Sequence, residues 1–302
     1  MDSIATRYTP PHRVRLRLVL APLVQGSTDP TARRTADGWW LTARFAAGVA
    51  TLLLRETADA VEARAWGPGA EEAIASVPAL LGADDDADGF DPARHPVVAR
   101  LHHETPGLRL ARAGRILPYL VPTVLGQKVT GIEQKAAWRQ LVTRFGEAAP
   151  GPAPLGMRVV PTAQVWRGIP SWVWHRAGVG PQRSDTLMRV FAVADSLERG
   201  ATMPSAEAGR RLRSVVGVGG WTVAETVQRS HGDPDAVSVG DLHLCKRVGT
   251  ALIGQRVDDD GMLELLEPWR GHRQRVVRLI EAAGIGYERH GPRLTIPEHR
   301  AR

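Results

Sequence analysis

The chain has 302 residues, a formal charge of +7 and an isoelectric point near 10.4, a balance that favours a polyanionic partner. Its only cysteine, Cys245, excludes an internal disulfide framework, a multi-cysteine zinc site and an iron–sulfur cluster held by four thiolates of this chain. No apolar run approaches about twenty residues, and the N-terminus lacks the apolar region of a signal peptide, so we expect a cytoplasmic protein without a membrane span.

The first 92 residues predict a small antiparallel α+β domain. Residues 1–11 look like an irregular leader. The run VRLRLVLAPL, residues 14–23, alternates apolar residues with arginines at its start, which predicts a half-buried strand. Turn residues then separate three more strands, and one helix backs the sheet. The strands are expected at Gly38–Phe45, Val49–Arg55 and Ala60–Trp66, and the helix runs from after Gly69 to about Leu81.

An acidic stretch follows this domain. GADDDADGFDPARHP, residues 82–96, resembles a calcium-binding loop at first sight. It lacks the twelve-residue spacing with a closing glutamate that such a loop needs. We therefore expect a polar linker here.

Residues 93–302 predict an all-α domain. Apolar residues between Ile116 and Phe145 are spaced for two buried helices with a break near residues 126–130, and a loop rich in proline and glycine follows at 148–156. Short connections join the later helices, as in a compact helical domain. These helices are expected at Thr162–Gly168, Ser171–Ala177, Gln182–Leu197, Ser205–Val215, Trp221–Ser230, Leu242–Ile253, Asp258–Leu265 and Gly271–Ala283.

The positive charge is concentrated at the start of this helical region. Residues 94–147 contain nine lysines or arginines and only three acidic residues. A clustered excess of this kind is typical of a surface that binds the phosphate backbone of a nucleic acid.

A glycine turn separates two of the predicted helices, Ser205–Val215 and Trp221–Ser230. Gly217, Gly219 and Gly220 can adopt positive φ and leave their backbone N–H groups uncovered. The helix that restarts at Trp221 adds unpaired first-turn amides and the positive end of its dipole, so the turn suits a phosphate. A plain corner between two helices is the alternative. A Rossmann fingerprint is excluded, because no strand precedes the glycines and no full GxGxxG is present.

A carboxylate, Asp241, follows at the start of the next predicted helix. Taken alone, an aspartate in this position is explained as an N-cap. Taken together, the phosphate-binding turn and the acid place a carboxylate beside a nucleic-acid backbone. That arrangement suits cleavage of a glycosidic bond.

The whole pattern resembles the helix-hairpin-helix DNA glycosylases, and among them the bacterial 3-methyladenine DNA glycosylase II branch. The resemblance covers nearly the whole chain, including the N-terminal sheet domain. The combination of hairpin and aspartate is specific, whereas any one fragment is not. The similar segments are LVPTVLGQKVTGIEQKA (Leu120–Ala136), VVGVGGWTVAE (Val215–Glu225), HGDPDAVSVGDLHL (His231–Leu244) and EPWRGHR (Glu267–Arg273).

The resemblance implies a monomeric, nucleoid-associated enzyme of base excision repair that acts on damaged double-stranded DNA and needs no cofactor. Asp241 would be the catalytic carboxylate. The amides of Val218, Gly219 and Gly220 would hold a DNA phosphate, and a monovalent cation is compatible with the carbonyls of residues 215–220. The hairpin residues that bind DNA would be Gly217, Val218, Gly219, Gly220 and Thr222.

Trp221 implies the type of reaction. Relatives that also cut the DNA strand carry a lysine just before the hairpin threonine, where it attacks the sugar. Trp221 stands at that position here, before Thr222, as in the alkylation-repair branch. Because an indole has no amine, we expect a monofunctional glycosylase. Trp221 is also the first candidate to stack on the flipped base, and a core tryptophan beneath the hairpin is the alternative.

Gln127 and Lys128 lie at the predicted break between two helices, where the family inserts a side chain into the gap left by the extruded base. Which of the two fills the gap stays open. An ordinary exposed helix turn is the alternative.

The chemistry favours an alkylated purine, such as 3-methyladenine, as the substrate. Hydrolysis develops positive charge on the sugar, which an ionised Asp241 would stabilise while it orients the attacking water. A cationic leaving base needs no proton donor. The family has aromatic residues in its base pocket, but Glu225, Leu242 and Arg278 stand at those positions, so we expect a more polar pocket. The alternatives are a glycosylase for an oxidised or deaminated base and a non-catalytic protein that binds DNA structures.

Overall fold

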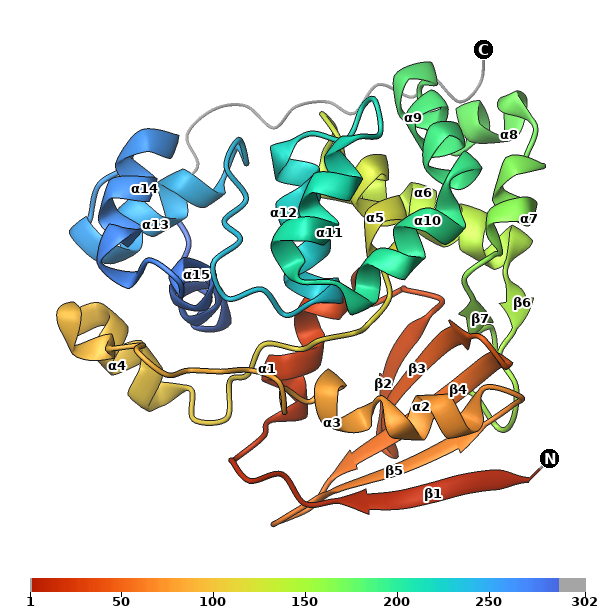
Figure 1. Cartoon of the computed structure of the whole chain (residues 1–302), viewed down its shortest axis with the longest axis horizontal. Helices are drawn as coiled ribbons and strands as arrows, with labels where there is room; N and C mark the ends of the chain where they lie inside the picture. Colours follow the sequence, from red (N-terminus) through yellow and green to blue (C-terminus); the bar gives the residue numbers. More distant parts are fainter. Residues whose placement is uncertain (1, 288–302) are drawn as a thin grey trace.

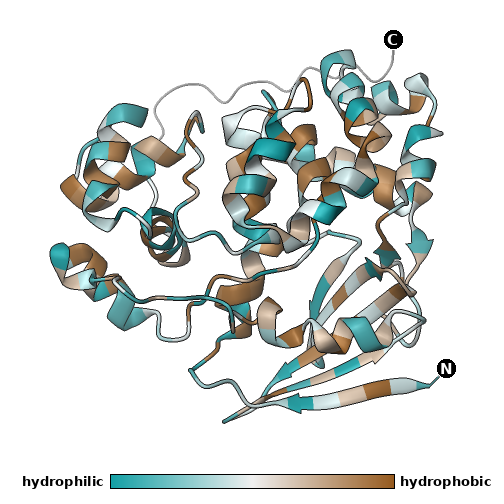
Figure 2. Ribbon diagram, viewed as in Figure 1, coloured by the Kyte–Doolittle hydropathy of each residue, from teal (hydrophilic) through white to brown (hydrophobic). Residues whose placement is uncertain are grey.

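The computed structural model describes residues 2–287 (Figure 1). Its three main hydrophobic clusters lie in the N-terminal sheet domain and in two separate groups of helices. We call these groups the central lobe, residues 116–230, and the terminal lobe, residues 96–104 with 244–282. Helices of both lobes carry hydrophobic and hydrophilic residues in alternating patches, the amphipathic pattern of helices around a core (Figure 2).

The N-terminal domain is built on a five-stranded antiparallel sheet in the order β1-β5-β4-β3-β2. The three strands predicted after residue 37 are confirmed. Along β5, buried Val61 and Ala63 alternate with exposed Glu62 and Arg64, the period of a strand with one face in the core. The predicted helix is present as two short segments, α2 (Ala70–Ala75) and α3 (Val77–Leu80). The strands are β1 (Ser3–Tyr8), β2 (Ala32–Thr35), β3 (Gly38–Phe45), β4 (Gly48–Glu56) and β5 (Val61–Trp66).

Two predictions for the first 23 residues are wrong. Residues 1–11 are not an irregular leader, because they include β1, which pairs with β5 along its whole length. The run at 14–23 is not a strand, because it forms α1 (Leu16–Leu20) and a 3-10 turn at Ala21–Leu23. Buried residues recur in it at i, i+3, i+4 and i+7, which turns one helix face into the core. These residues are Leu16, Val19, Leu20 and Leu23.

The central lobe contains the helices predicted between residues 116 and 230, with two differences. The helix expected at Gln182–Leu197 is divided at Val193, and the loop at 148–156 is flanked by a two-stranded ladder, β6 (Glu147–Ala148) with β7 (Arg158–Val159). The helices are α5 (Leu117–Leu125), α6 (Gly131–Phe145), α7 (Ala163–Arg167), α8 (Ser171–Arg176), α9 (Pro181–Ala192), α10 (Ala194–Glu198), α11 (Ser205–Arg213) and α12 (Gly220–Ser230).

The terminal lobe joins an early helix to the last part of the chain. Val98 and Leu101 of α4 (Pro96–Glu104) share one hydrophobic cluster with α13 (Leu244–Ile253), α14 (Asp259–Leu266) and α15 (Arg273–Ala282). The region predicted as one all-α domain therefore consists of two lobes, which residues 231–243 connect (Figure 1). The predicted fold class is confirmed: a small antiparallel sheet domain precedes a helical region.

The acidic stretch at 82–96 is not simply a solvated linker. The Asp85 side chain is 1% exposed, and its carboxylate accepts hydrogen bonds from both terminal nitrogens of Arg275, at 2.7 and 2.9 Å. Asp85 therefore fixes this stretch to α15. Within residues 2–287 no group of three or more His, Cys, Asp or Glu side chains is arranged to hold a metal ion. The same part of the chain contains no helix that is long and apolar enough to cross a bilayer.

Candidate nucleic-acid interface and catalytic carboxylate

The turn between α11 and α12 is a tight hairpin packed against α9. Gly217 has a φ of +97°, and a Cβ atom there would lie 2.2 Å from Thr186 Oγ1 of α9. Any other residue at this position would be strained and would clash. The Val218 N–H donates to the Val215 carbonyl at 3.0 Å and closes the turn.

The N-terminus of α12 presents unpaired donors. The amides of Gly219 and Gly220 have no acceptor among residues 2–287, and both residues are exposed. A Cβ atom at Gly219 would meet nothing within 4 Å, so packing does not require a glycine there. Exposed amides at the positive end of a helix suit an anion. The Val218 amide, expected to bind phosphate, is already used inside the turn, which leaves Gly219 and Gly220 as the hairpin donors.

Gln127 and Lys128 occupy the turn between α5 and α6, beside the hairpin. Gln127 Nε2 donates to the Gly217 carbonyl and to Thr222 Oγ1, both at 2.9 Å. Lys128 is exposed and has a φ of +56°, which is uncommon for a residue with a side chain. Gln127 therefore braces the hairpin, and Lys128 is the exposed member of the pair. A cation on the turn carbonyls would share the Gly217 oxygen with the Gln127 amide.

Asp241 faces both the start of α13 and the hairpin helix. Its Oδ1 accepts hydrogen bonds from the amides of His243, at 2.8 Å, and Leu244, at 3.0 Å, which is the bonding of an N-cap. Its Oδ2 accepts a longer bond, 3.3 Å, from Nε1 of Trp221 on α12. Asp241 and the first turn of the hairpin helix α12, twenty residues apart in the sequence, are thus in direct contact. One carboxylate oxygen is held by the backbone, and the other is turned toward Trp221.

The loop that carries Asp241, residues 231–243, is anchored to both helical lobes. On the central side, His231 Nε2 donates to the Gly200 carbonyl at 3.1 Å, and burial lowers the pKa of this imidazole. On the terminal side, Asp235 pairs with Arg273 of α15 at 2.6 Å. Burial opposes ionisation of Asp235, but hydrogen bonds from Arg273 outweigh it and lower the pKa of the carboxyl. The position of Asp241 therefore depends on both lobes.

Glu225 braces the same loop from α12. Its carboxylate accepts a hydrogen bond from Ser238 Oγ and pairs with Arg229, one turn further along the helix, at 3.0 Å. Gln228 adds bonds to the same hydroxyl, at 2.8 Å, and to the Ala236 carbonyl, at 2.7 Å. This network was not predicted, because Ser238 and Gln228 carry no motif that marks them. Glu225 is thus a support of the Asp241 loop in the unbound protein.

The other three residues expected in the base pocket, Trp221, Leu242 and Arg278, differ in their exposure and in their contacts. Trp221 is half-buried and directed at Asp241, whereas Leu242 is 69% exposed. Arg278 of α15 pairs with Glu281 and donates to the Leu18 carbonyl at 3.4 Å. The polar side chains expected in the base pocket therefore lie on α12 (Glu225) and α15 (Arg278). Leu242 is instead exposed to solvent.

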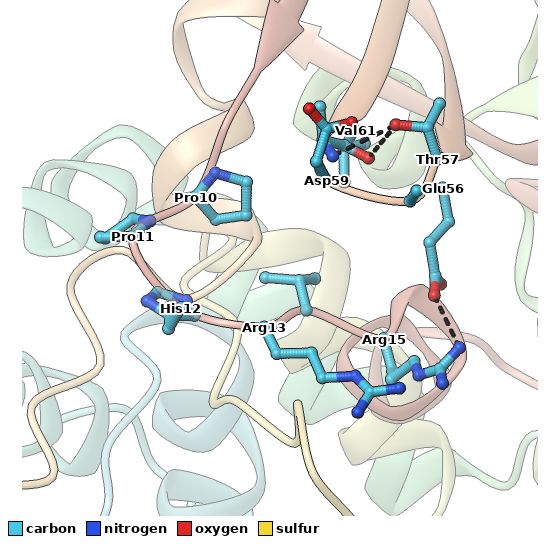
Figure 3. Close-up of a pocket in the computed structure, with 12 residues that line it drawn as sticks. Pro10, Pro11, His12, Arg13, Arg15, Glu56, Thr57, Asp59 and Val61 are labelled. Atoms are coloured by element: carbon cyan, nitrogen blue, oxygen red, sulfur yellow. Dashed lines mark hydrogen bonds and ion pairs between the residues drawn. The ribbon is translucent and has the colours of Figure 1, made fainter.

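The two cavities that stand out do not contain Asp241. The larger, about 510 Å³, lies in the sheet domain between residues 10–15 and 56–61 (Figure 3). The smaller, about 20 Å³, is a crevice between α1, α12 and α15, and Gln228, Gln274 and Arg278 are among its lining residues. Trp221 and Glu225 line neither of them.

No protein-family model and no curated protein sequence matches the chain. Solved structures do match it. A 3-methyladenine DNA glycosylase from Archaeoglobus fulgidus superimposes with a TM-score of 0.75 at 13% identity, over 91% of this chain and 97% of its own. An apo 8-oxoguanine glycosylase/lyase from Clostridium acetobutylicum gives 0.70 at 14% identity, over 93% and 96%. A 3-methyladenine DNA glycosylase from Schizosaccharomyces pombe, solved with abasic DNA, gives 0.52 at 17% identity, over 67% and 96%.

The chain has the helix-hairpin-helix DNA glycosylase fold. Within this glycosylase fold, the matched proteins are named for two different damaged bases, 3-methyladenine and 8-oxoguanine, and one of them is also named as a lyase. The fold alone therefore does not decide the substrate or the type of reaction. Those depend on the side chains of this chain.

Two of the three hairpin glycines, Gly217 and Gly219, should respond differently to alanine. Gly217→Ala should destabilise the protein by roughly 1 kcal/mol or more, because the residue has positive φ and lies against Thr186. Gly219→Ala should leave the free energy of unfolding nearly unchanged and weaken duplex DNA binding severalfold, since a methyl group would stand between the amides and a phosphate. Urea unfolding and fluorescence anisotropy would measure the two effects. Unchanged DNA binding by folded Gly219→Ala would show that no phosphate approaches this turn.

Proposed function

We propose that this protein is a monofunctional DNA glycosylase that flips a damaged base out of duplex DNA and hydrolyses its N-glycosidic bond with Asp241. The observation that carries the proposal is the contact between Asp241 and Trp221, beside a hairpin with unpaired amides. A phosphate on the amides of Gly219 and Gly220 would hold the DNA backbone at the helix that faces the acid.

Asp241 would act on the charge that develops during bond cleavage. As the base leaves, the sugar gains oxocarbenium character, and a carboxylate near C1′ stabilises it. The same carboxylate orients a water molecule or accepts its proton. The two backbone amides that hold Oδ1 fix the carboxylate in advance, so little reorganisation is needed during the reaction.

The lysine inventory supports hydrolysis without strand cleavage. A Schiff-base nucleophile needs an amine, and the chain has only three lysines, Lys128, Lys135 and Lys246. None of them lies on α12, where Trp221 faces Asp241. We expect borohydride treatment during the reaction to trap no covalent complex with DNA. A trapped complex that disappears in Lys128→Ala would instead make the exposed lysine a nucleophile.

An alkylated purine remains our first proposed substrate, because its cationic base leaves without a proton donor. A neutral oxidised or deaminated base is the second candidate. Release of a neutral base would need a proton donor at the leaving nitrogen.

A substrate panel tests the proposal and separates these candidates. The protein is incubated with methylated duplex DNA and with duplexes that contain 8-oxoguanine, uracil or hypoxanthine, and released bases are measured by chromatography. Release of methylated purines alone would support the first candidate, and release of a neutral base the second. Absence of release from every duplex, in a sample that is folded and binds DNA, would favour the non-catalytic protein that binds DNA structures.

A further inference from the structure

A second basic surface lies on the outer helices of the central lobe, away from the Asp241 loop. Residues 148–184, which include α7 and α8, contain four arginines and no acidic residue. Trp172 of α8 is 55% exposed. An exposed large aromatic side chain in a basic surface has no role in the core, and it is typical of a contact site.

Two arginines flank this exposed indole. The guanidinium carbon of Arg144, at the end of α6, lies 5.5 Å from the centre of the Trp172 ring, and that of Arg176 lies 5.6 Å from it. The acid closest to Arg144 in sequence, Glu147, pairs with Arg44 instead. A guanidinium stacked on a ring keeps its in-plane N–H groups available, and these bind phosphate in pairs. Trp172 therefore orders Arg176 and, together with Phe145 at 5.1 Å, Arg144 as phosphate donors at the surface.

Helix α9 connects this surface to the hairpin. Arg183 near its start donates to the Leu125 carbonyl, where α5 ends, and to the Gly178 carbonyl, just after α8, both at 2.8 Å. Thr186, one turn later, contacts the hairpin at Gly217. The hairpin, α9 and α8 follow one another along one edge of the molecule (Figure 1). Along α6, the thirteen steps from Gly131 to Arg144 span about 20 Å, the length of about six base pairs.

We propose that Arg144, Trp172 and Arg176 form a second DNA contact, which binds the phosphodiester backbone of the duplex that flanks the damaged site. The inference rests on the proposed binding of DNA by the hairpin. The second contact itself takes no part in the cleavage of the glycosidic bond. Because guanidinium groups on phosphates carry no sequence information, the contact adds affinity and orientation without base preference. It requires a duplex that extends more than about six base pairs from the lesion on that side.

Binding to two lengths of duplex, each with an abasic-site analogue at its centre, tests the contact. The double variant Arg144→Gln/Arg176→Gln should bind a duplex of about 25 base pairs roughly tenfold more weakly than the unmodified protein, with a salt slope smaller by about 1.8 for two lost phosphate contacts. A duplex of about 11 base pairs has only about five base pairs on either side of its central analogue and does not reach the surface, so its affinity should change less than about twofold. Trp172→Ala should weaken binding to the long duplex only, because it releases Arg176 and leaves Arg144 over the Phe145 ring alone.

A matched control removes two arginines from another part of the molecule. Arg34 and Arg64 are exposed on the sheet domain, and Arg34 lies over Trp39 as Arg144 lies over Trp172. Arg34→Gln/Arg64→Gln should leave both affinities unchanged. Equal losses on both duplex lengths, or an equal loss in the control, would show that the arginines act only through net charge and would overturn the proposal. If the unmodified protein binds neither duplex, the proposed glycosylase function fails as well.

Discussion

Asp241→Asn is expected to lower the rate of base release by at least about 100-fold and to change the affinity for the same damaged duplex by less than about threefold. Asparagine keeps the Oδ1 acceptor that the His243 and Leu244 amides use, so the start of α13 should stay intact. It loses the negative charge that would face the sugar as the bond breaks. Single-turnover kinetics with excess protein would measure the chemical step, and anisotropy would measure binding.

Asp258→Asn is the matched control for this substitution. Asp258 is the N-cap of α14, and its side chain accepts a hydrogen bond from the Gly261 amide at 2.9 Å, much as Asp241 accepts bonds from the His243 and Leu244 amides where α13 begins. It belongs to the helix after α13, so base release should remain within about twofold of the unmodified protein while the capping chemistry changes in the same way. If Asp241→Asn retains full activity, another group carries the reaction. If both variants lose activity equally, the effect reflects helix capping.

The hairpin and the place of Asp241 just before α13 were predictable because they depend on local backbone chemistry. Glycines that interrupt a helix and an aspartate that begins one are visible in a single sequence. The supporting contacts were not. The bond from Gln127 to the Gly217 carbonyl and the bond from Ser238 to Glu225 join residues whose proximity depends on how α5, α12 and the 231–243 loop pack. Gln127 is predicted to bind DNA and Glu225 to line the base pocket; in the unbound protein Gln127 bonds to the hairpin and Glu225 to the loop that carries Asp241.

The error at residues 14–23 has a similar cause. Val14, Leu16, Leu18 and Leu20 fit the period of a strand, while Leu16, Val19, Leu20 and Leu23 fit the period of a helix. Neither pattern is stronger locally. The place beside β5 is taken by β1, whose own burial pattern is mostly exposed and gave no signal. Tertiary pairing therefore decides between two secondary structures that the residues permit equally.

The largest loss of stability is expected from separating Asp85 from Arg275. Both side chains are nearly inaccessible, 1% and 5% exposed, and their two hydrogen bonds measure 2.7 and 2.9 Å. Arg275→Met leaves a buried carboxylate without its main partner, and Asp85→Asn leaves a buried guanidinium. Each substitution should lower the free energy of unfolding by about 3–5 kcal/mol, measured by urea denaturation. Disrupting the exposed pair of Arg7 and Asp59 should cost at most about 1 kcal/mol.

The double variant Asp85→Asn/Arg275→Met tests whether the stability lost in the single variants comes from the interaction between these two residues or from their other contacts. Because most of the cost in each single variant comes from the charge left behind, removing both charges should cost clearly less than the sum of the two single losses. Additive losses would mean that the two residues stabilise the protein independently, for example through the Asp85 bond to the Leu110 amide at 3.1 Å. The pair ties residues 82–88 to α15, and Asp235 ties the Asp241 loop to Arg273 of the same helix. Loosening α15 should therefore also reduce base release, even though Asp85 has no contact with Asp241.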